Sequence, residues 1–262
     1  MRTAWDIQSA AAELLACEAT RRDREPFTDE WRDLDLATAY TIQDHNLSRR
    51  LERGEALVGV KLGLTSKAKQ QRMGVHAPFV AWLTDAMALP AGDPIPQHRL
   101  IHPRVEPEIV FLIGRRLRGP GVTAMQAMAA VESVWAGAEI IDSRYRDFRF
   151  AAPDVIADNA SAAAFAIGPV GLSPRKLNLV LEAAVVEVNG AIVDTATGAA
   201  VQGHPAEALA LAANELATRG HAIEPGQIVL TGGMTDAVYA PPGTSIACHF
   251  TNLGSVFLNG GD

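Results

Sequence analysis

The chain of 262 residues contains only two cysteines, Cys17 and Cys248, which lie far apart. They form no metal-spaced motif, so we expect no thiolate zinc site, and the simplest interpretation is a reduced, cytoplasmic setting. Basic residues are in the minority, with 23 Lys and Arg against 30 Asp and Glu and a formal net charge of −7. Because the sequence has no basic stripe, a nucleic acid is not an expected partner.

Long apolar runs and the common nucleotide motifs are absent as well. No run approaches the roughly eighteen apolar residues of a membrane span, and the N-terminus lacks the apolar core of a signal peptide, so no membrane association is expected. The sequence has no Gly-x-Gly-x-x-Gly after a strand pattern, no Gly-Lys-Ser phosphate loop, no Gly-x-Ser-x-Gly and no His-Glu-x-x-His. Nucleotide-dependent chemistry and serine hydrolysis therefore lose support.

The first part of the chain is predicted to be helical and the rest mainly β. Residues 4–22 have an amphipathic helical pattern, and a second helix is predicted from the cap Asp35 to about residue 53, with Gly54 ending it. We therefore expect an N-terminal helical segment over residues 1–55 and a β-rich catalytic domain over 56–262. The predicted fold class is α+β.

Within the β-rich part, some elements have clear local signals. Asn189-Gly190 between two apolar stretches is typical of a type I′ hairpin turn. A helix is predicted to begin at Pro205 and to end at Gly220. Two further helices are expected over residues 66–73 and 123–132, and β structure over 58–65, 227–233, 244–250 and 253–258.

Glu106 and Glu108 stand directly ahead of an apolar run. In an extended segment side chains alternate between faces, so the two carboxylates project to the same side. A Glu-x-Glu pair on a strand is commonly a solvated face. Pro107 between them cannot donate a ladder hydrogen bond, which indicates a strand start, an edge or a bulge. Glu139 also lies among apolar residues in the sequence. Three carboxylate ligands with open coordination positions would suit Mg²⁺ or Mn²⁺.

Lys61 lies in a strand pattern in which Val58, Val60 and Leu62 form an apolar face. Gly59 and Gly63 flank Lys61 on the opposite face and leave room for a ligand to approach. A single lysine on a strand is also typical of an edge or of a solvent-exposed position. Both interpretations stay open on this pattern alone.

Two polar segments follow the third acid. Arg144 lies where charged and aromatic residues alternate, which fits a salt-bridged surface turn or a clamp for a substrate carboxylate. The tetrad Asp158-Asn159-Ala160-Ser161 is a loop by composition. Such a loop can supply binding groups or cap the next element.

Six ordered blocks resemble a known family. The blocks are Gly59–Ser66, Ile101–Ile109, Glu139–Tyr145, Ala157–Ser161, Gly203–Pro205 and Leu230–Gly233. They are similar to blocks of the 2-keto-4-pentenoate hydratase and 4-oxalocrotonate decarboxylase group of the fumarylacetoacetate hydrolase superfamily. The resemblance spans nearly the whole chain beyond about residue 35. The decarboxylase members are the more similar, on His102 before Pro103, the run Ile141–Tyr145 and the run Thr231–Thr235.

The resemblance implies a mixed β-barrel or roll with flanking helices. It also implies a Mg²⁺ or Mn²⁺ held by Glu106, Glu108 and Glu139, with Lys61 facing the substrate. Asp158 would act in catalysis, by moving a proton or by hydrogen bonding, and the residues assigned to substrate binding are Ser161, Thr231 and Arg144. Members form homo-oligomers, and a decarboxylase is expected to associate with its partner hydratase.

The expected reaction is the metal-dependent decarboxylation of a small 2-oxo dicarboxylic acid, 2-oxohex-3-enedioate, to 2-hydroxypenta-2,4-dienoate in meta-cleavage degradation of aromatic compounds. One alternative is a hydratase that adds water to 2-hydroxypenta-2,4-dienoate with the same metal and lysine. Another is a carbon–carbon bond hydrolase of the same superfamily, for which no added base is evident. A non-catalytic scaffold subunit is the alternative from a different class, although such a subunit would not need a costly cluster of acids.

Overall fold

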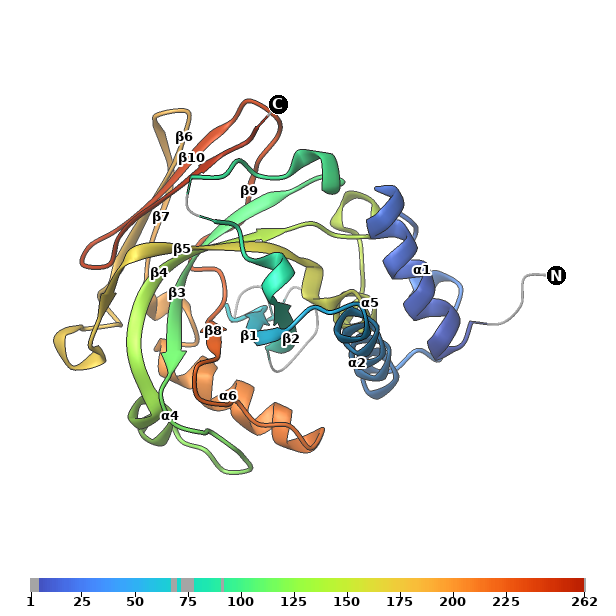
Figure 1. Cartoon of the computed structure of the whole chain (residues 1–262), viewed down its shortest axis with the longest axis horizontal. Coiled ribbons are helices and arrows are strands. Elements are labelled where there is room, and N and C mark those ends of the chain that lie inside the picture. The colour runs from blue at the N-terminus through green and yellow to red at the C-terminus, as the bar shows by residue number, and fades with distance from the viewer. Residues whose placement is uncertain (1–4, 67–69, 72–77, 91, 262) are drawn as a thin grey trace.

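The computed structural model describes residues 5–66, 70–71, 78–90 and 92–261, and Figure 1 shows their arrangement. Two β-sheets form the body of the molecule, with α4 and α6 on one side and α1, α2 and α5 at one end. The predicted helix over residues 66–73 falls largely outside the described residues. Within them, no helix is long and apolar enough to cross a membrane.

The larger sheet has seven strands and mixed directions. Its order is β2-β1-β8-β3-β4-β5, with β9 paired to β3, and only the β1/β8 pair is parallel. The strands are β1 (Leu57–Gly63), β2 (Phe79–Thr84), β3 (Arg104–Ile113), β4 (Val131–Ile141), β5 (Ala162–Leu172), β8 (Ile228–Leu230) and β9 (Val238–Tyr239).

The smaller sheet has the order β11-β10-β6-β7, and all its pairs are antiparallel. Its strands are β6 (Ala183–Val188), β7 (Ala191–Thr197), β10 (Ser245–Phe250) and β11 (Gly254–Asn259). Asn189 and Gly190 both have positive φ, at 51° and 79°, which confirms the predicted tight hairpin turn. β11 packs against β4 and β5, so the two sheets share one apolar core. Among the described strands each sheet is open, with an edge strand at both ends. The expected barrel or roll is therefore seen as two sheets packed together.

The helices are α1 (Ile7–Thr20), α2 (Leu36–Glu52), α4 (Ala124–Ala130), α5 (Ala152–Ala157) and α6 (Pro205–Thr218). The short 3₁₀ turns are η1 (Phe27–Asp29), η2 (Asp85–Met87), η3 (Gln97–Arg99), η4 (Arg146–Phe148), η5 (Asn159–Ser161), η6 (Pro174–Lys176) and η7 (Gly198–Ala200).

Local capping explains where the helices begin. The Asp35 carboxylate accepts the backbone N–H of Thr38, which confirms the predicted start of α2. Pro205 takes the first position of α6, as predicted, and His204 caps the helix through its Nδ1 atom. Helices α1, α2 and α5 pack around a second apolar cluster that includes Phe27 and Tyr145. This cluster holds the N-terminal helices against the β-rich part of the chain.

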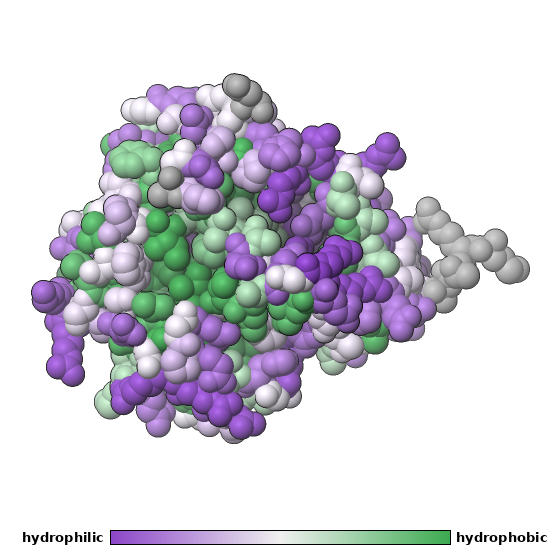
Figure 2. Space-filling model, in the orientation of Figure 1, coloured by the Kyte–Doolittle hydropathy of each residue, from purple (hydrophilic) through white to green (hydrophobic). Residues whose placement is uncertain are grey.

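The structure corrects two predicted boundaries. The helix expected over residues 123–132 ends at Ala130, because Val131 already pairs with Ile113 on β3. The β structure expected over residues 227–233 is limited to β8. After β8 the chain leaves the sheet through Gly232, which has a positive φ of 105°. Figure 2 shows that hydrophobic residues gather near the centre of the face seen in Figure 1, between the larger sheet and α6.

Candidate metal centre and substrate pocket

Three carboxylates come together because β3 and β4 are antiparallel neighbours. Glu106 lies opposite Glu139 in the strand register, and Glu108 follows on the same side of β3. A carboxylate oxygen from each residue lies within 4.8 Å of one from each of the other two. Glu108 and Glu139 are fully buried, and Glu106 is partly exposed. The solvated-face interpretation of the Glu-x-Glu pair is therefore wrong for Glu108.

Pro107 lies where β3 has no strand neighbour on one side. β8 pairs with residues 110–112 of β3 and β9 with residues 104–105, and between them the carbonyl of Pro107 accepts the N–H of Met234. The missing N–H of proline thus breaks no ladder hydrogen bond on that side. The sequence predicted a strand start, an edge or a bulge at Pro107, and among the described residues the structure shows a local gap in pairing within an interior strand.

Burial of two of the acids changes their proton affinity. Oε2 of Glu108 accepts the N–H of Gly232 at 2.7 Å, whereas Oε1 is buried with no hydrogen-bond partner among the described residues. Burial, followed by the negative charge of Glu139, raises the pKa of Glu108 well above its ordinary value. Burial also raises the pKa of Glu139, and the Glu106 charge adds to that effect.

These residues fit a hard divalent cation. Three carboxylates supply oxygen ligands of the kind that Mg²⁺ and Mn²⁺ prefer, and the unpartnered oxygen of Glu108 is available for one of the bonds. A cation between the three groups would remove their mutual repulsion and compensate for their burial.

Two glycines bring the chain after β8 close to the acids. A Cβ atom added to Gly233 would lie 2.6 Å from the carboxylate carbon of Glu106. One added to Gly232, whose φ is 105°, would lie 2.2 Å from Oγ1 of Thr65. Only glycine fits at either position. In the sequence this Gly-Gly pair stands out only as part of a family block, and no local signal indicates its contact with the acids.

Lys61 lies on β1, between β2 and β8, so the edge interpretation of this lysine is wrong. Its side chain is only 3% exposed, and its Nζ atom lies 3.0 Å and 3.1 Å from the two carboxylate oxygens of Glu139. A lysine is almost never buried unless it is paired. Glu139 supplies that pairing, which brings the ammonium group next to the acid cluster.

A pocket of about 550 Å³, counted with its open mouth, lies beside Lys61 and Glu106. The other polar side chains in its wall are Thr65 and Ser161. The rest of the described wall is mainly apolar and includes Leu64, Phe79, Ile141, Phe148, Phe150 and Val155. The pocket is thus polar at the end where Glu106 and Lys61 lie, and the remainder of its described wall, called its apolar body below, is mainly apolar. Sequence reasoning missed Phe148 and Phe150, which stand among the alternating charged and aromatic residues.

Arg144 and Thr231 have contacts that differ from those expected. The guanidinium of Arg144 is buried, forms an ion pair with Asp158 and donates to the backbone carbonyls of Asp142, Asp158 and Ala162. These donors are occupied within the protein, as the surface-turn alternative requires of an ion-paired arginine, and the substrate clamp stays a prediction. The buried Thr231 hydroxyl donates to the carbonyl of Ile109 at 2.8 Å, and its expected role in holding a substrate carboxylate stays a prediction.

Asp158 lies behind the pocket wall. Its carboxylate accepts the Nε and backbone N–H of Arg144 and the hydroxyl of Ser161. Burial raises the pKa of Asp158 to about 6, although the Arg144 charge opposes that shift. Ser161, three residues later, does line the pocket. Of this polar tetrad, the structure therefore brings Ser161 into the same pocket wall as Lys61 and Glu106, whereas Asp158 is not among the residues of that wall.

The chain is similar to proteins of known activity. Residues 56–257 match the family described as Fumarylacetoacetate (FAA) hydrolase C-terminal. The chain is 39% identical over 250 residues to a 4-oxalocrotonate decarboxylase of Pseudomonas sp. (strain CF600), covering 95% of each chain. It is 40% identical over 211 residues to a 2-hydroxypent-2,4-dienoate hydratase of Pseudomonas putida, covering 80% of this chain and 95% of the relative.

The fold is also that of a solved structure. The 4-oxalocrotonate decarboxylase from Pseudomonas putida G7, complexed with magnesium and adipate, aligns with a TM-score of 0.93 and 38% sequence identity. The alignment covers 97% of this chain and 96% of the other. The match therefore includes the N-terminal helices as well as the two sheets.

Proposed function

The chain belongs to the fumarylacetoacetate hydrolase family, and from this premise we propose that it decarboxylates 2-oxohex-3-enedioate (4-oxalocrotonate) to 2-hydroxypenta-2,4-dienoate in a metal-dependent reaction. The reaction belongs to meta-cleavage degradation of aromatic compounds. The observation that carries the proposal is the buried cluster Glu106, Glu108 and Glu139 with Lys61 beside it at the end of a pocket. The decarboxylase name shared by the relative and the solved structure supports it.

Glu106, Glu108 and Glu139 would hold Mg²⁺ or Mn²⁺. When bound, such a cation supplies Lewis-acid polarisation of a carbonyl oxygen. The three glutamates would hold the cation at the polar end of the pocket, so the 2-oxo acid end of the substrate would bind there. The far carboxylate then extends toward the apolar body of the pocket.

Lys61 stabilises the charge that develops in the reaction. Loss of the far carboxylate as CO₂ sends its electron pair through the conjugated chain to the C2 oxygen. The buried ammonium group of Lys61, beside Glu139, would act there as an electrostatic partner in surroundings of low polarity. Removing a preorganised donor of this kind costs roughly 10²- to 10³-fold in rate.

The apolar wall favours decarboxylation over hydration. Leu64, Phe148 and Phe150 offer no polar side-chain group to a carboxylate, which is costly to bury without a partner. Carbon dioxide is neutral, so the free-energy cost of burying the charged carboxylate disappears when the carboxylate is converted to CO₂. The same wall limits the access of water to the chain of the substrate. Ser161, in the polar part of the wall, contacts the bound substrate.

The direct test supplies 2-oxohex-3-enedioate and Mg²⁺ to the purified protein, with and without a chelator. We expect metal-dependent CO₂ release together with loss of the ultraviolet absorbance of the conjugated enone. A second candidate function is hydration of 2-hydroxypenta-2,4-dienoate, which the 40% identical hydratase favours. Formation of 4-hydroxy-2-oxovalerate without CO₂ release would establish that reaction instead. If the protein turns over neither compound, the result would favour the alternative that it is a non-catalytic scaffold subunit.

We also propose that the protein forms a homo-oligomer and associates with a 2-hydroxypenta-2,4-dienoate hydratase. Large apolar side chains are exposed on the smaller sheet, with Ile192 at 65% and Phe257 at 68%. Contiguous exposed apolar surface is typical of faces that bind other chains, and the two edge strands β7 and β11 that carry these side chains are where we expect such contacts. Light scattering of the protein alone and mixed with the hydratase tests both associations, and a monomer in both samples would contradict them.

A further inference from the structure

Three successive residues beside the pocket have a left-handed backbone without being glycine. Asn159, Ala160 and Ser161 have φ values of 51°, 49° and 59°. A Cβ atom disfavours this conformation, so single non-glycine residues adopt it uncommonly and three in a row are rarer still. Such a turn persists only where its surroundings hold it in place, and it is typical of functional sites.

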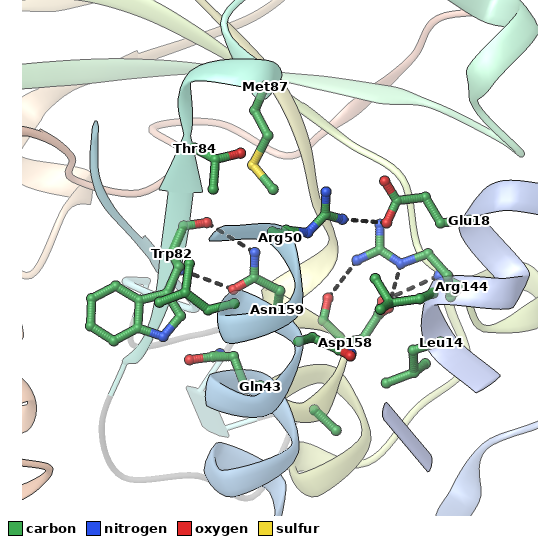
Figure 3. A pocket seen from close by; sticks show the side chains of 14 residues that line it. Leu14, Glu18, Gln43, Arg50, Trp82, Thr84, Met87, Arg144, Asp158 and Asn159 are labelled. Carbon is green, nitrogen blue, oxygen red and sulfur yellow. Dashed lines mark hydrogen bonds and ion pairs between the residues drawn. The ribbon is translucent and has the colours of Figure 1, made fainter. Parts of the chain in front are cut away.

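The turn separates two cavities. Ala160 and Ser161 line the pocket that holds Lys61 and Glu106. Asp158 and Asn159 line a second cavity together with Arg144, Arg50 and Glu18 (Figure 3). The contacts that hold the turn lie on the side away from the candidate metal centre.

Arg144 binds both ends of the turn. Its Nη2 atom donates to the carbonyl of Asp158, before the turn, and its Nη1 atom donates to the carbonyl of Ala162, after it. Its Nε atom also forms an ion pair with the Asp158 carboxylate, as Figure 3 shows. The planar, forked geometry of a guanidinium suits several fixed acceptors at once, which an ammonium group cannot reproduce.

Two other contacts complete the support. The Asn159 amide donates to the carbonyl of Trp82 and accepts its N–H, both at 2.9 Å, which ties the turn to β2. The Asp158 carboxylate accepts the Ser161 hydroxyl at 3.3 Å. A chain of contacts thus leads from Arg144 through Asp158 to the hydroxyl group in the pocket wall.

We infer that Arg144 is a positioning residue, which holds the left-handed turn 159–161 through Asp158 and thereby orients Ser161 in the wall of the substrate pocket. Asp158 is the intermediate link in this arrangement and transfers no proton. The orienting role rests on the proposed function. The holding of the turn does not, because it follows from the contacts of Arg144 in the protein itself.

The test is a double-mutant cycle with Arg144→Lys and Ser161→Ala in the full-length chain. Arg144→Lys should lower kcat by about 100-fold, the scale expected for a small misplacement of a substrate-binding group, while Mn²⁺ affinity stays unchanged. In the Ser161→Ala background the same change should cost far less, because the group it positions is already absent. Equal costs in both backgrounds would overturn the inference.

Hydrogen exchange supplies a readout that needs no turnover. Amides of residues 158–162 should exchange at least roughly tenfold faster in Arg144→Lys than in the wild-type protein, with the strands of the larger sheet unaffected. Arg146→Gln is the matched control, because Arg146 is exposed on the same connection and pairs with Asp23 and Glu25 at the surface. It should change neither exchange nor kcat.

The outcomes separate the two proposals. If the wild-type protein does not decarboxylate, the proposed function fails, and unchanged exchange in Arg144→Lys would overturn the holding role independently. If Arg144→Lys does not fold, Asp158→Asn replaces it. That change keeps the shape of the side chain but puts a donor where the Ser161 hydroxyl and the Arg144 N–H need an acceptor. It should give the same pattern in the cycle, and additive costs would again overturn the inference.

Discussion

The Nζ atom of Lys61 lies 3.0 Å from a carboxylate oxygen of Glu139, and both side chains are buried. This ion pair links the Lys61 ammonium group, which is proposed to face the substrate, to Glu139, one of the three proposed metal ligands. Since the pair is buried, each member depends on the other for compensation of its charge. A change at Lys61 therefore affects both turnover and the stability of the metal-free protein.

Lys61→Met should lower kcat by roughly 10²- to 10³-fold, because the charge that develops on the substrate loses its electrostatic partner. Metal binding should be retained. Without Lys61, Mg²⁺ alone compensates the acids, so Mg²⁺ should raise the unfolding temperature more in Lys61→Met than in the wild-type protein. Turnover at the wild-type rate would contradict the proposed role of Lys61.

Glu108→Gln should weaken Mg²⁺ and Mn²⁺ binding strongly, because the amide keeps the shape of the side chain but removes a charged ligand. Calorimetric titration with Mn²⁺ measures the change. Glu132→Gln, at an exposed position on β4, is the matched control and should bind the metal normally. Normal Mn²⁺ affinity in Glu108→Gln would remove this residue from the site.

The stabilising effect of the metal should increase with pH. Burial raises the pKa of Glu108 above its ordinary value of about 4.5, so the metal-free folded protein keeps a proton that the unfolded chain releases. Its stability therefore falls as pH rises from 4.5 toward the raised pKa. A metal ion displaces that proton, so it binds better as pH rises through the same window.

Unfolding temperatures with and without Mg²⁺, measured from about pH 5 to about pH 8, test this dependence. The difference between the two temperatures should grow with pH in the wild-type protein. It should be flatter in Glu108→Gln, which lacks the Glu108 carboxyl group, and the raised pKa of Glu139 would account for the pH dependence that remains. A difference independent of pH in the wild-type protein would show that Glu108 does not exchange its proton for the metal.

Gly233→Ala should weaken metal binding, although residue 233 is not itself a proposed ligand. Its new Cβ atom would meet the Glu106 carboxylate at 2.6 Å and push it away. Gly168→Ala is the control, because its Cβ atom would have no neighbour closer than 3.4 Å. Mn²⁺ affinity should fall only in Gly233→Ala, and equal affinities in the two variants would mean that Glu106 can move without loss.

Thr231→Val should reduce stability and leave the KM for 2-oxohex-3-enedioate nearly unchanged. The buried hydroxyl donates to the carbonyl of Ile109, and losing that hydrogen bond should lower the free energy of unfolding by about 1 kcal/mol. Denaturant unfolding and steady-state kinetics measure the two effects separately. A large rise in KM with unchanged stability would instead support a direct contact with the substrate.

The short-range features of the protein were predictable from the sequence. Alternation along a strand puts Glu106 and Glu108 on one side of β3, and the positions of Asp35, Pro205 and Asn189-Gly190 mark the start of α2, the start of α6 and the hairpin turn. Each depends on residues only a few positions apart. The backbone period and the capping chemistry are therefore sufficient to identify them.

Long-range pairing decided the rest. The β3/β4 register puts Glu139 opposite Glu106, and the place of β1 between β2 and β8 turns Lys61 from a possible edge residue into a buried partner of Glu139. Arg144 looked like a substrate clamp in the sequence, but its donors bind the chain around residues 158–162. No local pattern encodes these contacts, because they depend on which distant strands pair and on how a buried charge is compensated once they do.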